Sequence, residues 1–167
     1  RNRAMWLGIN LITAVLASLV IGLFDATIQS FVALAVLMPI VASMGGNAGT
    51  QTLTVTVRQM ALGEIDYQDA KKIIYKEVMI SIVNGLLFAA VIGVVAYLWF
   101  NIPLLGVVIA ISMIINLFSA GFFGAVIPIV LQKKGIDPAI GSTVILTTVT
   151  DVVGFFSFLG LATLILL

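Results

Sequence analysis

Five long apolar stretches dominate the sequence, and each is long enough to cross a lipid bilayer. A helix needs roughly 20 apolar residues to span the hydrocarbon core. The stretches run from about Ala4 to Phe24, Phe31 to Val57, Ile73 to Phe100, Pro103 to Leu131 and Pro138 to Leu167. Their apolar runs are continuous and lack the in–out alternation of barrel strands. The sequence therefore predicts an all-α membrane protein with five transmembrane helices.

Charged side chains are too few to coat a water-facing surface. They make up 9% of the 167 residues, whereas a soluble domain carries about 25%. The chain has no Cys and no His, which removes thiolate chemistry and the usual ligands of zinc, copper and haem. Any metal must then be held by oxygen. With a net charge of +1 and no nucleophile–base pair, we expect neither a nucleic-acid partner nor an enzyme.

The basic residues predict how the helices are oriented. Because the links between spans are short, neighbouring spans run antiparallel and alternate links face the same side. All eight basic residues lie before the first span or around the second and fourth links: Arg1, Arg3, Arg58, Lys71, Lys72, Lys76, Lys133 and Lys134. Basic residues gather on the cytoplasmic side of membrane proteins. We expect a cytoplasmic N-terminus, an external C-terminus and one transmembrane domain over residues 1–167, embedded in the plasma (inner) membrane.

One acidic residue, Asp151, is predicted to lie at mid-membrane depth. It follows Pro138 by 13 residues, which is ~20 Å along a helix in a hydrocarbon core of ~30 Å. A charge at that depth costs at least about 2.5–3.5 kcal/mol. Three interpretations stay open: the carboxylate coordinates a cation, it carries a proton, or it is protonated and bonded to a neighbouring carbonyl.

Threonine hydroxyls accompany this carboxylate. Thr147 and Thr148 precede Asp151 by four and three residues, so both lie close to its helical face. They are candidate oxygen ligands or pore-lining groups. The alternative is that each bonds back to a carbonyl of its own helix, which we expect for any one threonine taken alone.

A glycine-rich segment, residues 44–51, forms the second candidate feature. Its glycines and polar side chains are Gly45, Gly46, Asn47, Gly49, Thr50 and Gln51. Glycines weaken a helix and expose backbone carbonyls, or they form a seam for close helix packing. The added side-chain oxygens favour the wall of a pore. Depth estimates place Asp151 nearer Pro39–Ala42 than Asn47, so the segment would line the cytoplasmic half of a path. The lone Asn84 and Asn116 are expected to join helices.

A single carboxylate is a poor cage for a dehydrated divalent ion. Two copies related by a two-fold axis would supply two carboxylates. A hydrated ion such as Mg2+, which loses its waters reluctantly, needs few direct protein ligands. The residues thus favour a homodimer with a pore on its axis.

Three segments, 39–51, 135–138 (Gly-Ile-Asp-Pro) and 150–154 (Thr-Asp-Val-Val-Gly), together resemble the MgtE family of magnesium channels. Their order and the five-span layout match as well. The resemblance implies a homodimeric Mg2+ channel whose second and fifth spans line the pore. It implies that Asp151 holds largely hydrated Mg2+ at the pore centre, with help from the Thr147 carbonyl, and that Thr50 lies near the cytoplasmic gate.

The same resemblance implies a regulatory Mg2+ site at Asp137, against cytosolic Mg2+-sensing domains. This sequence does not contain those domains; it begins at Arg1 and is expected to be the transmembrane part of a longer protein. Passive Mg2+ conduction is the leading interpretation. A cation- or proton-coupled transporter that uses Asp151 and a non-transporting anchoring domain are the alternatives. Residue types alone do not separate Mg2+ from Ca2+ or Mn2+, since oxygen ligands suit all three.

Overall fold

The computed structural model describes residues 2–63, 70–136 and 138–166, and its regular structure there is entirely helical. The helices are α1 (Asn2–Gly22), α2 (Asp25–Ser30), α3 (Val32–Ala61), α4 (Ala70–Phe100), α5 (Pro103–Lys133) and α6 (Pro138–Leu166). Five of them are long and apolar enough to cross a membrane. The all-α, five-span prediction is confirmed. The short α2 lies where the sequence predicted only a link.

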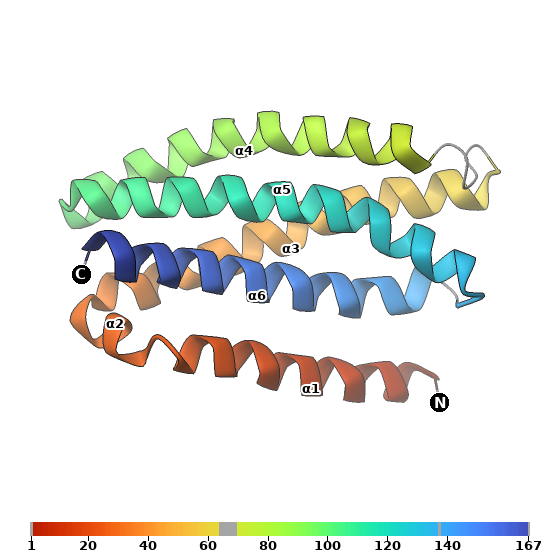
Figure 1. Ribbon diagram of the computed structural model, residues 1–167, viewed down its shortest axis with the longest axis horizontal. Coiled ribbons are helices and arrows are strands. Elements are labelled where there is room, and N and C mark those ends of the chain that lie inside the picture. The colour runs from red at the N-terminus through yellow and green to blue at the C-terminus, as the bar shows by residue number, and fades with distance from the viewer. Residues whose placement is uncertain (1, 64–69, 137, 167) are drawn as a thin grey trace.

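Helix α5 forms the centre of the molecule. It packs against α3, α4 and α6, whereas α4 packs mainly on α5, and α1 mainly on α6. The five long helices lie alongside one another, with α1 at the periphery (Figure 1). Most of the α5 span is buried, and almost none of the α1 span is. In a single chain, lipid would therefore contact α1 on nearly all of its sides.

The link between α5 and α6 follows the capping rules that its sequence predicts. Gly135 adopts a φ of 79°, a left-handed conformation that glycine accepts without strain. Its N–H donates to the Gln132 carbonyl at 3.1 Å, and the N–H of Ile136 donates to the Leu131 carbonyl at 2.9 Å. These bonds close the end of α5. Pro138 then begins α6, where its fixed φ suits the first turn.

Small residues let α4 and α5 approach closely. A Cβ atom built on Gly106 of α5 would lie 2.7 Å from the carbonyl oxygen of Gly93 in α4. Further along the pair, a Cβ on Gly121 would collide with the side chain of Ser81. Such small-residue seams are the usual way for membrane helices to pack, because lipid provides no hydrophobic force between them.

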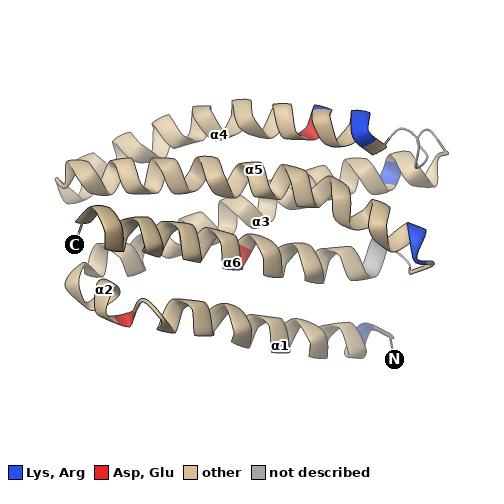
Figure 2. Cartoon of the chain, in the orientation of Figure 1, with Lys and Arg blue, Asp and Glu red and all other residues tan. Residues whose placement is uncertain are grey.

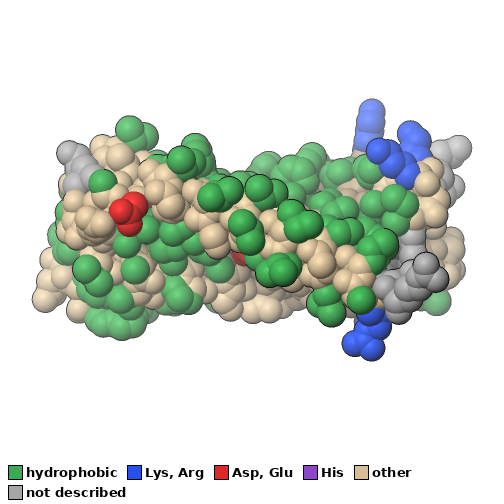
Figure 3. Space-filling model, turned by 90° about the horizontal axis from the view of Figure 1, so that it is seen from below, with side chains coloured by type: hydrophobic (Ala, Val, Ile, Leu, Met, Phe, Trp, Pro, Cys, Tyr) green, Lys and Arg blue, Asp and Glu red, His purple; other side chains and the backbone are tan. Residues whose placement is uncertain are grey.

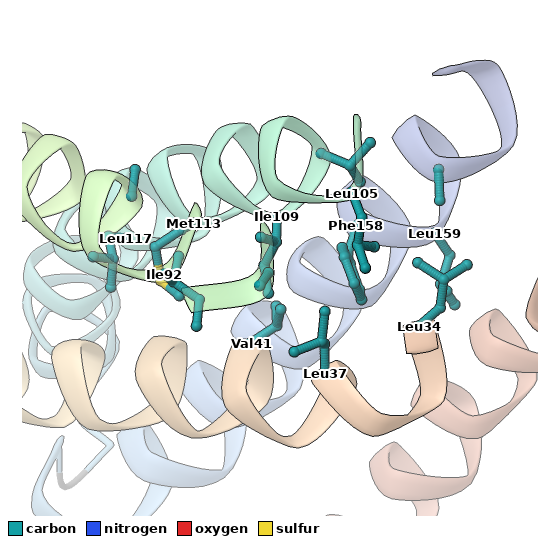
Figure 4. Close-up of a cluster of buried hydrophobic side chains, with 14 residues drawn as sticks. Leu34, Leu37, Val41, Ile92, Leu105, Ile109, Met113, Leu117, Phe158 and Leu159 are labelled. Carbon is teal, nitrogen blue, oxygen red and sulfur yellow. The ribbon is translucent and has the colours of Figure 1, made fainter. Parts of the chain in front are cut away.

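An apolar cluster joins α3, α5 and α6 in the half of the bundle near α2. Leu37 and Val41 of α3 meet Ile109 of α5 and Phe158 of α6, and all four are fully buried. Figure 4 shows these side chains directed toward one another between the three helices. A hydrogen bond of 2.7 Å between the hydroxyls of Thr27 and Thr163 also joins α2 to α6. The position of α3 relative to α6 is thus set by packing.

Lys and Arg residues gather at one end of the molecule, the end where α1 begins (Figure 2). The space-filling view shows the same end on the α1 side, with apolar side chains along the rest of that face (Figure 3). Charge and apolar surface are therefore distributed as a membrane-spanning bundle requires. The basic end is the one that the sequence predicts to be cytoplasmic.

Candidate functional site

Asp151 lies midway along α6, 13 residues after its first residue and 15 before its last. Its side chain is half-buried. No hydrogen bond or ion pair to the carboxylate is found among the residues that the structure describes. Its oxygens are therefore available to a ligand. The structure shows no bond from this group to a neighbouring carbonyl within those residues.

The threonines beside this carboxylate bond to their own helix. Thr147 donates to the Thr143 carbonyl at 2.7 Å, and Thr148 donates to the Val144 carbonyl at 2.8 Å. Thr150 donates to the Thr147 carbonyl at 3.1 Å. The hydroxyl protons are thus used within α6, as the packing interpretation expects. Each hydroxyl oxygen keeps a lone pair with which it could accept a hydrogen bond from water.

Two close contacts fix the antiparallel register of α3 on α6. A Cβ on Gly154 would lie 3.0 Å from Cγ1 of Val41, and a Cβ on Gly49 would lie 2.9 Å from Cδ2 of Leu146. Interpolation between the two contacts places Asp151 level with the first residue of the segment 44–51. The depth estimate from sequence put Asp151 about one turn closer to the N-terminus of α3. The carboxylate and the glycine-rich segment therefore lie closer together than predicted.

The glycines of this segment serve close packing in an unbroken helix. Helix α3 continues through all of residues 44–51. A Cβ on Gly45 would collide with the side chain of Asn116 in α5, and Gly49 meets Leu146 in α6. Gly46, in contrast, has open space beside it. The expected weakening of the helix is absent, and the packing interpretation accounts for Gly45 and Gly49.

Four polar side chains form a row along the outer face of α3: Ser43, Asn47, Thr50 and Thr54, which we call the polar row. All four are exposed, and their spacing of four, three and four residues keeps them on one face. Asn47 donates to the Ser43 hydroxyl at 3.3 Å, and Thr50 donates to the Gly46 carbonyl at 2.8 Å. Polar groups at membrane depth require water or a protein partner. The polar row is therefore the candidate surface of α3 for contact with water or with another protein chain.

Two depressions flank the polar row. One, of about 360 Å³, lies between α3 and α6 and includes Thr50, Thr54, Arg58 and Thr143 in its wall. The other lies between α3 and α4 and includes Gln51. Side chains that are close in sequence thus face different neighbours. Thr50 faces α6, the helix that contains Asp151, whereas Gln51 faces α4.

Two further polar residues are placed by the structure. Asn116, expected to join helices, does so: its Nδ2 donates to the Val41 carbonyl of α3 at 3.0 Å. Glu77, which was not among the candidate residues from sequence, is buried in α4 with 7% exposure. It accepts a hydrogen bond from the Thr52 side chain. A sequence signal existed, because Glu77, Ser81 and Asn84 share one face of an otherwise apolar helix.

The carboxylates do not form a dense metal cage. No group of three or more His, Cys, Asp or Glu side chains comes together in residues 2–63, 70–136 and 138–166. Asp137, the candidate regulatory ligand, lies outside these ranges. A cation bound at Asp151 would therefore meet one carboxylate per chain and oxygen atoms of hydroxyls, carbonyls or water. That arrangement suits a hydrated hard cation better than a dehydrated one.

Comparison with known proteins identifies the family of the chain. Residues 38–161 match the MgtE family, described as divalent cation transporter. The magnesium transporter MgtE of Bacillus subtilis is 34% identical over 162 residues, which is 97% of this chain and 36% of the relative. The magnesium transporter MgtE of Thermus thermophilus is 31% identical over 164 residues, covering 98% and 36%. This chain thus spans little more than a third of these relatives. It is a multi-pass protein of the cell membrane and belongs to the MgtE family of divalent cation transporters.

Proposed function

We propose that this chain conducts largely hydrated Mg2+ across the cell membrane through a pore between two copies, with Asp151 of each copy at its centre. The relatives' name, magnesium transporter, supports the choice of ion. The observation that carries the proposal is the position of Asp151. Its carboxylate has no bonding partner among the described residues, lies midway along α6, and is level with the start of the polar row of α3.

The polar row supports the second copy. A single chain leaves Ser43, Asn47, Thr50 and Thr54 exposed at membrane depth, where lipid offers them no hydrogen bonds. Two copies related by a two-fold axis bring the same face of each chain together. If that axis runs beside α3 and α6, the two polar rows and the two Asp151 carboxylates line one water-filled path. The same arrangement doubles the negative charge available to a divalent ion.

The ligands available at this depth suit a hydrated ion. Mg2+ is small, prefers octahedral oxygen and gives up its waters slowly. The Asp151 carboxylates would attract the ion and accept hydrogen bonds from its waters. The hydroxyl oxygens of Thr147 and Thr148 would accept others, and the Thr147 carbonyl would do so in place of the Thr150 hydroxyl that it accepts at 3.1 Å. Conduction requires binding that is weak enough to release the ion, and contacts through water provide such binding.

The cytoplasmic half of the path would contain the gate. Thr50 lies beyond Asp151 toward the basic end, in the depression between α3 and α6. Asn47 accompanies it in the polar row, whereas Gln51 faces α4 and Gly45 and Gly49 are packed against α5 and α6. We assign Thr50 to the narrow part of the path. Asp137 would bind regulatory Mg2+ at the cytoplasmic face, together with Mg2+-sensing domains outside this chain.

A coupled transporter is the second candidate, because an unpaired carboxylate at mid-membrane depth also suits a proton carrier. Flux measurements in liposomes separate the two. A channel passes Mg2+ down its electrochemical gradient with no counter-ion. Flux that stops when the H+ and Na+ gradients are both removed, while the Mg2+ gradient remains, would favour the transporter.

The decisive variant is Asp151→Asn, which keeps the size of the side chain and removes its charge. We expect Mg2+ flux to fall about tenfold or more, the effect of losing about 1.4 kcal/mol of ion stabilisation. Asp25→Asn is the matched control, because Asp25 is exposed in α2 and accepts a hydrogen bond from Gln29 at 3.0 Å. Parallel assays with Ca2+ and Mn2+ measure selectivity. A folded Asp151→Asn protein with undiminished flux would refute the assigned site.

A further inference from the structure

A polar cavity of about 330 Å³ lies between α3 and α4, on a different face of α3 from α6 and Asp151. The polar residues in its wall are Gln51 and Thr52 of α3 and Lys76, Glu77, Ser81 and Asn84 of α4. Leu117 of α5 also lines it. An adjoining cavity of about 140 Å³ shares Gln51 and Asn84 and adds Asn47. Oxygen-bearing side chains therefore continue along the space between the two helices.

Glu77 is the most costly group in this wall. It is buried within a membrane-spanning helix, where a carboxylate needs hydrogen bonds or a counter-charge. The Thr52 side chain supplies one hydrogen bond from α3. Lys76, the neighbouring residue of α4, is exposed and lies at the cavity wall as the other charged group there. One hydrogen bond and one solvent-exposed amine leave most of the carboxylate's bonding capacity for the cavity.

We propose that this cavity binds a hydrated divalent cation, with Glu77 as its charged ligand. The hydroxyls of Thr52 and Ser81 and the amide oxygens of Gln51 and Asn84 would accept hydrogen bonds from the ion's waters. A volume of about 330 Å³ accommodates an ion with several waters, each of which occupies about 30 Å³ in the liquid. This site does not depend on Asp151 or on the proposed pore.

The site has a structural consequence, because it lies where two helices barely touch. Helix α4 packs on α5 and makes few contacts with α3. An ion held between Glu77 on α4 and Thr52 and Gln51 on α3 would join the two helices through the cavity. Occupancy of the site would then stabilise α3, the helix that carries the polar row.

A lipid headgroup fits the same cavity less well. Glu77 follows the start of α4 by seven residues and Asn84 by 14, so Asn84 lies ~10 Å deeper along the helix axis. A headgroup bound at Lys76 and Glu77 would direct its acyl chains toward Asn84 and Asn47. Acyl chains offer those amides no hydrogen bonds, whereas a hydrated ion and its water do.

Binding of Mn2+, a paramagnetic substitute for Mg2+, tests the proposal by electron paramagnetic resonance on the protein in lipid nanodiscs. The variants are compared in an Asp151→Asn background, so that a failure of the proposed pore site does not affect the result. We expect Glu77→Gln to bind one Mn2+ fewer per chain than this background. Glu77→Asp, which keeps the carboxylate, and Lys76→Gln, which removes the adjacent positive charge, should retain that ion. Mg2+ should displace it.

Two results would overturn the proposal. The first is an unchanged Mn2+ count in Glu77→Gln. The second is a Glu77→Gln variant that loses bound phosphatidylethanolamine in native mass spectrometry while its Mn2+ count is unaltered. That result would identify the cavity as a lipid site. Circular dichroism compares the fold of each variant. If Glu77→Gln misfolds, the double variant Ser81→Ala/Asn84→Ala, which keeps the carboxylate, replaces it. Loss of the Mn2+ ion in this double variant supports the proposal. Binding of the ion with unchanged affinity refutes it.

Discussion

Asn116 shows what one polar side chain contributes to an apolar helix. It is fully buried in α5, and its amide donates to the Val41 carbonyl of α3 at 3.0 Å. Gly45 of α3 and Gly154 of α6 both lack a side chain where the Asn116 amide lies. Three helices are therefore shaped around this single group, one turn from the level of the Asp151 carboxylate.

Replacing this amide should weaken the fold measurably. Asn116→Leu keeps a similar volume and removes the bond to α3, so we expect the free energy of unfolding to fall by about 1 kcal/mol. Asn10→Leu is the matched control, since Asn10 is exposed on α1. Unfolding by SDS in mixed micelles measures both. Equal stability of Asn116→Leu and the parent would show that the bond adds nothing.

At the scale of the element, the adjacent Gly45 and Gly46 of α3 should respond oppositely to the same substitution. A methyl group at Gly45 would collide with the Asn116 side chain, whereas nothing lies within 4 Å of one at Gly46. Alanine favours the helix by about 1 kcal/mol over glycine at either position, and overpacking costs about 1–3 kcal/mol. We expect Gly45→Ala to lower the thermal unfolding temperature and Gly46→Ala to preserve or raise it. Comparable temperatures for the two variants would contradict the packing described for α3.

The helices themselves were predictable, because length, charge and capping residues act locally. The predicted span Pro103–Leu131 begins where α5 begins and ends two residues before it. The sequence did not show which neighbouring helix packs against each face of a helix. Gln51 and Thr50 are adjacent, yet one faces α4 and the other α6. Periodicity reveals faces of a helix, but the neighbour of each face depends on how all the helices pack.

The candidate site was predictable to a similar degree. Asp151 was identifiable from its cost in a membrane, a property of residue type and depth alone. Its level on α3 was misplaced by about one turn, because straight-helix estimates omit the stagger set by Leu146 and Gly49. Glu77 was not singled out from the sequence, because it lies near the charged end of its span, close to Lys71, Lys72 and Lys76. Its burial depends on the packing of α4 against α5, where Gly121 lies against Ser81 and the Glu77 carbonyl.

For the whole molecule, apolar side chains cover much of the surface of one chain, and the polar row of α3 interrupts them. The basic residues lie at one end (Figure 2), and apolar side chains cover much of the α1 side between the ends (Figure 3). The polar row interrupts that apolar surface at membrane depth. A second copy placed over it removes the conflict between polar side chains and lipid, and it brings two Asp151 carboxylates toward one axis. In the proposed dimer, assembly and ion conduction would both depend on this one face of the chain.

The arrangement of two copies predicts where they can be cross-linked. The chain has no cysteine, so single substitutions give unambiguous products with a bismaleimide in native membranes. Thr54→Cys on the polar row should yield a two-chain product, because a two-fold axis brings equivalent residues together. Val83→Cys, on the apolar outer face of α4 and 62% exposed, should remain a single chain. Cross-linking at Val83 that equals or exceeds cross-linking at Thr54 would place the interface on α4 and remove the polar row from the pore.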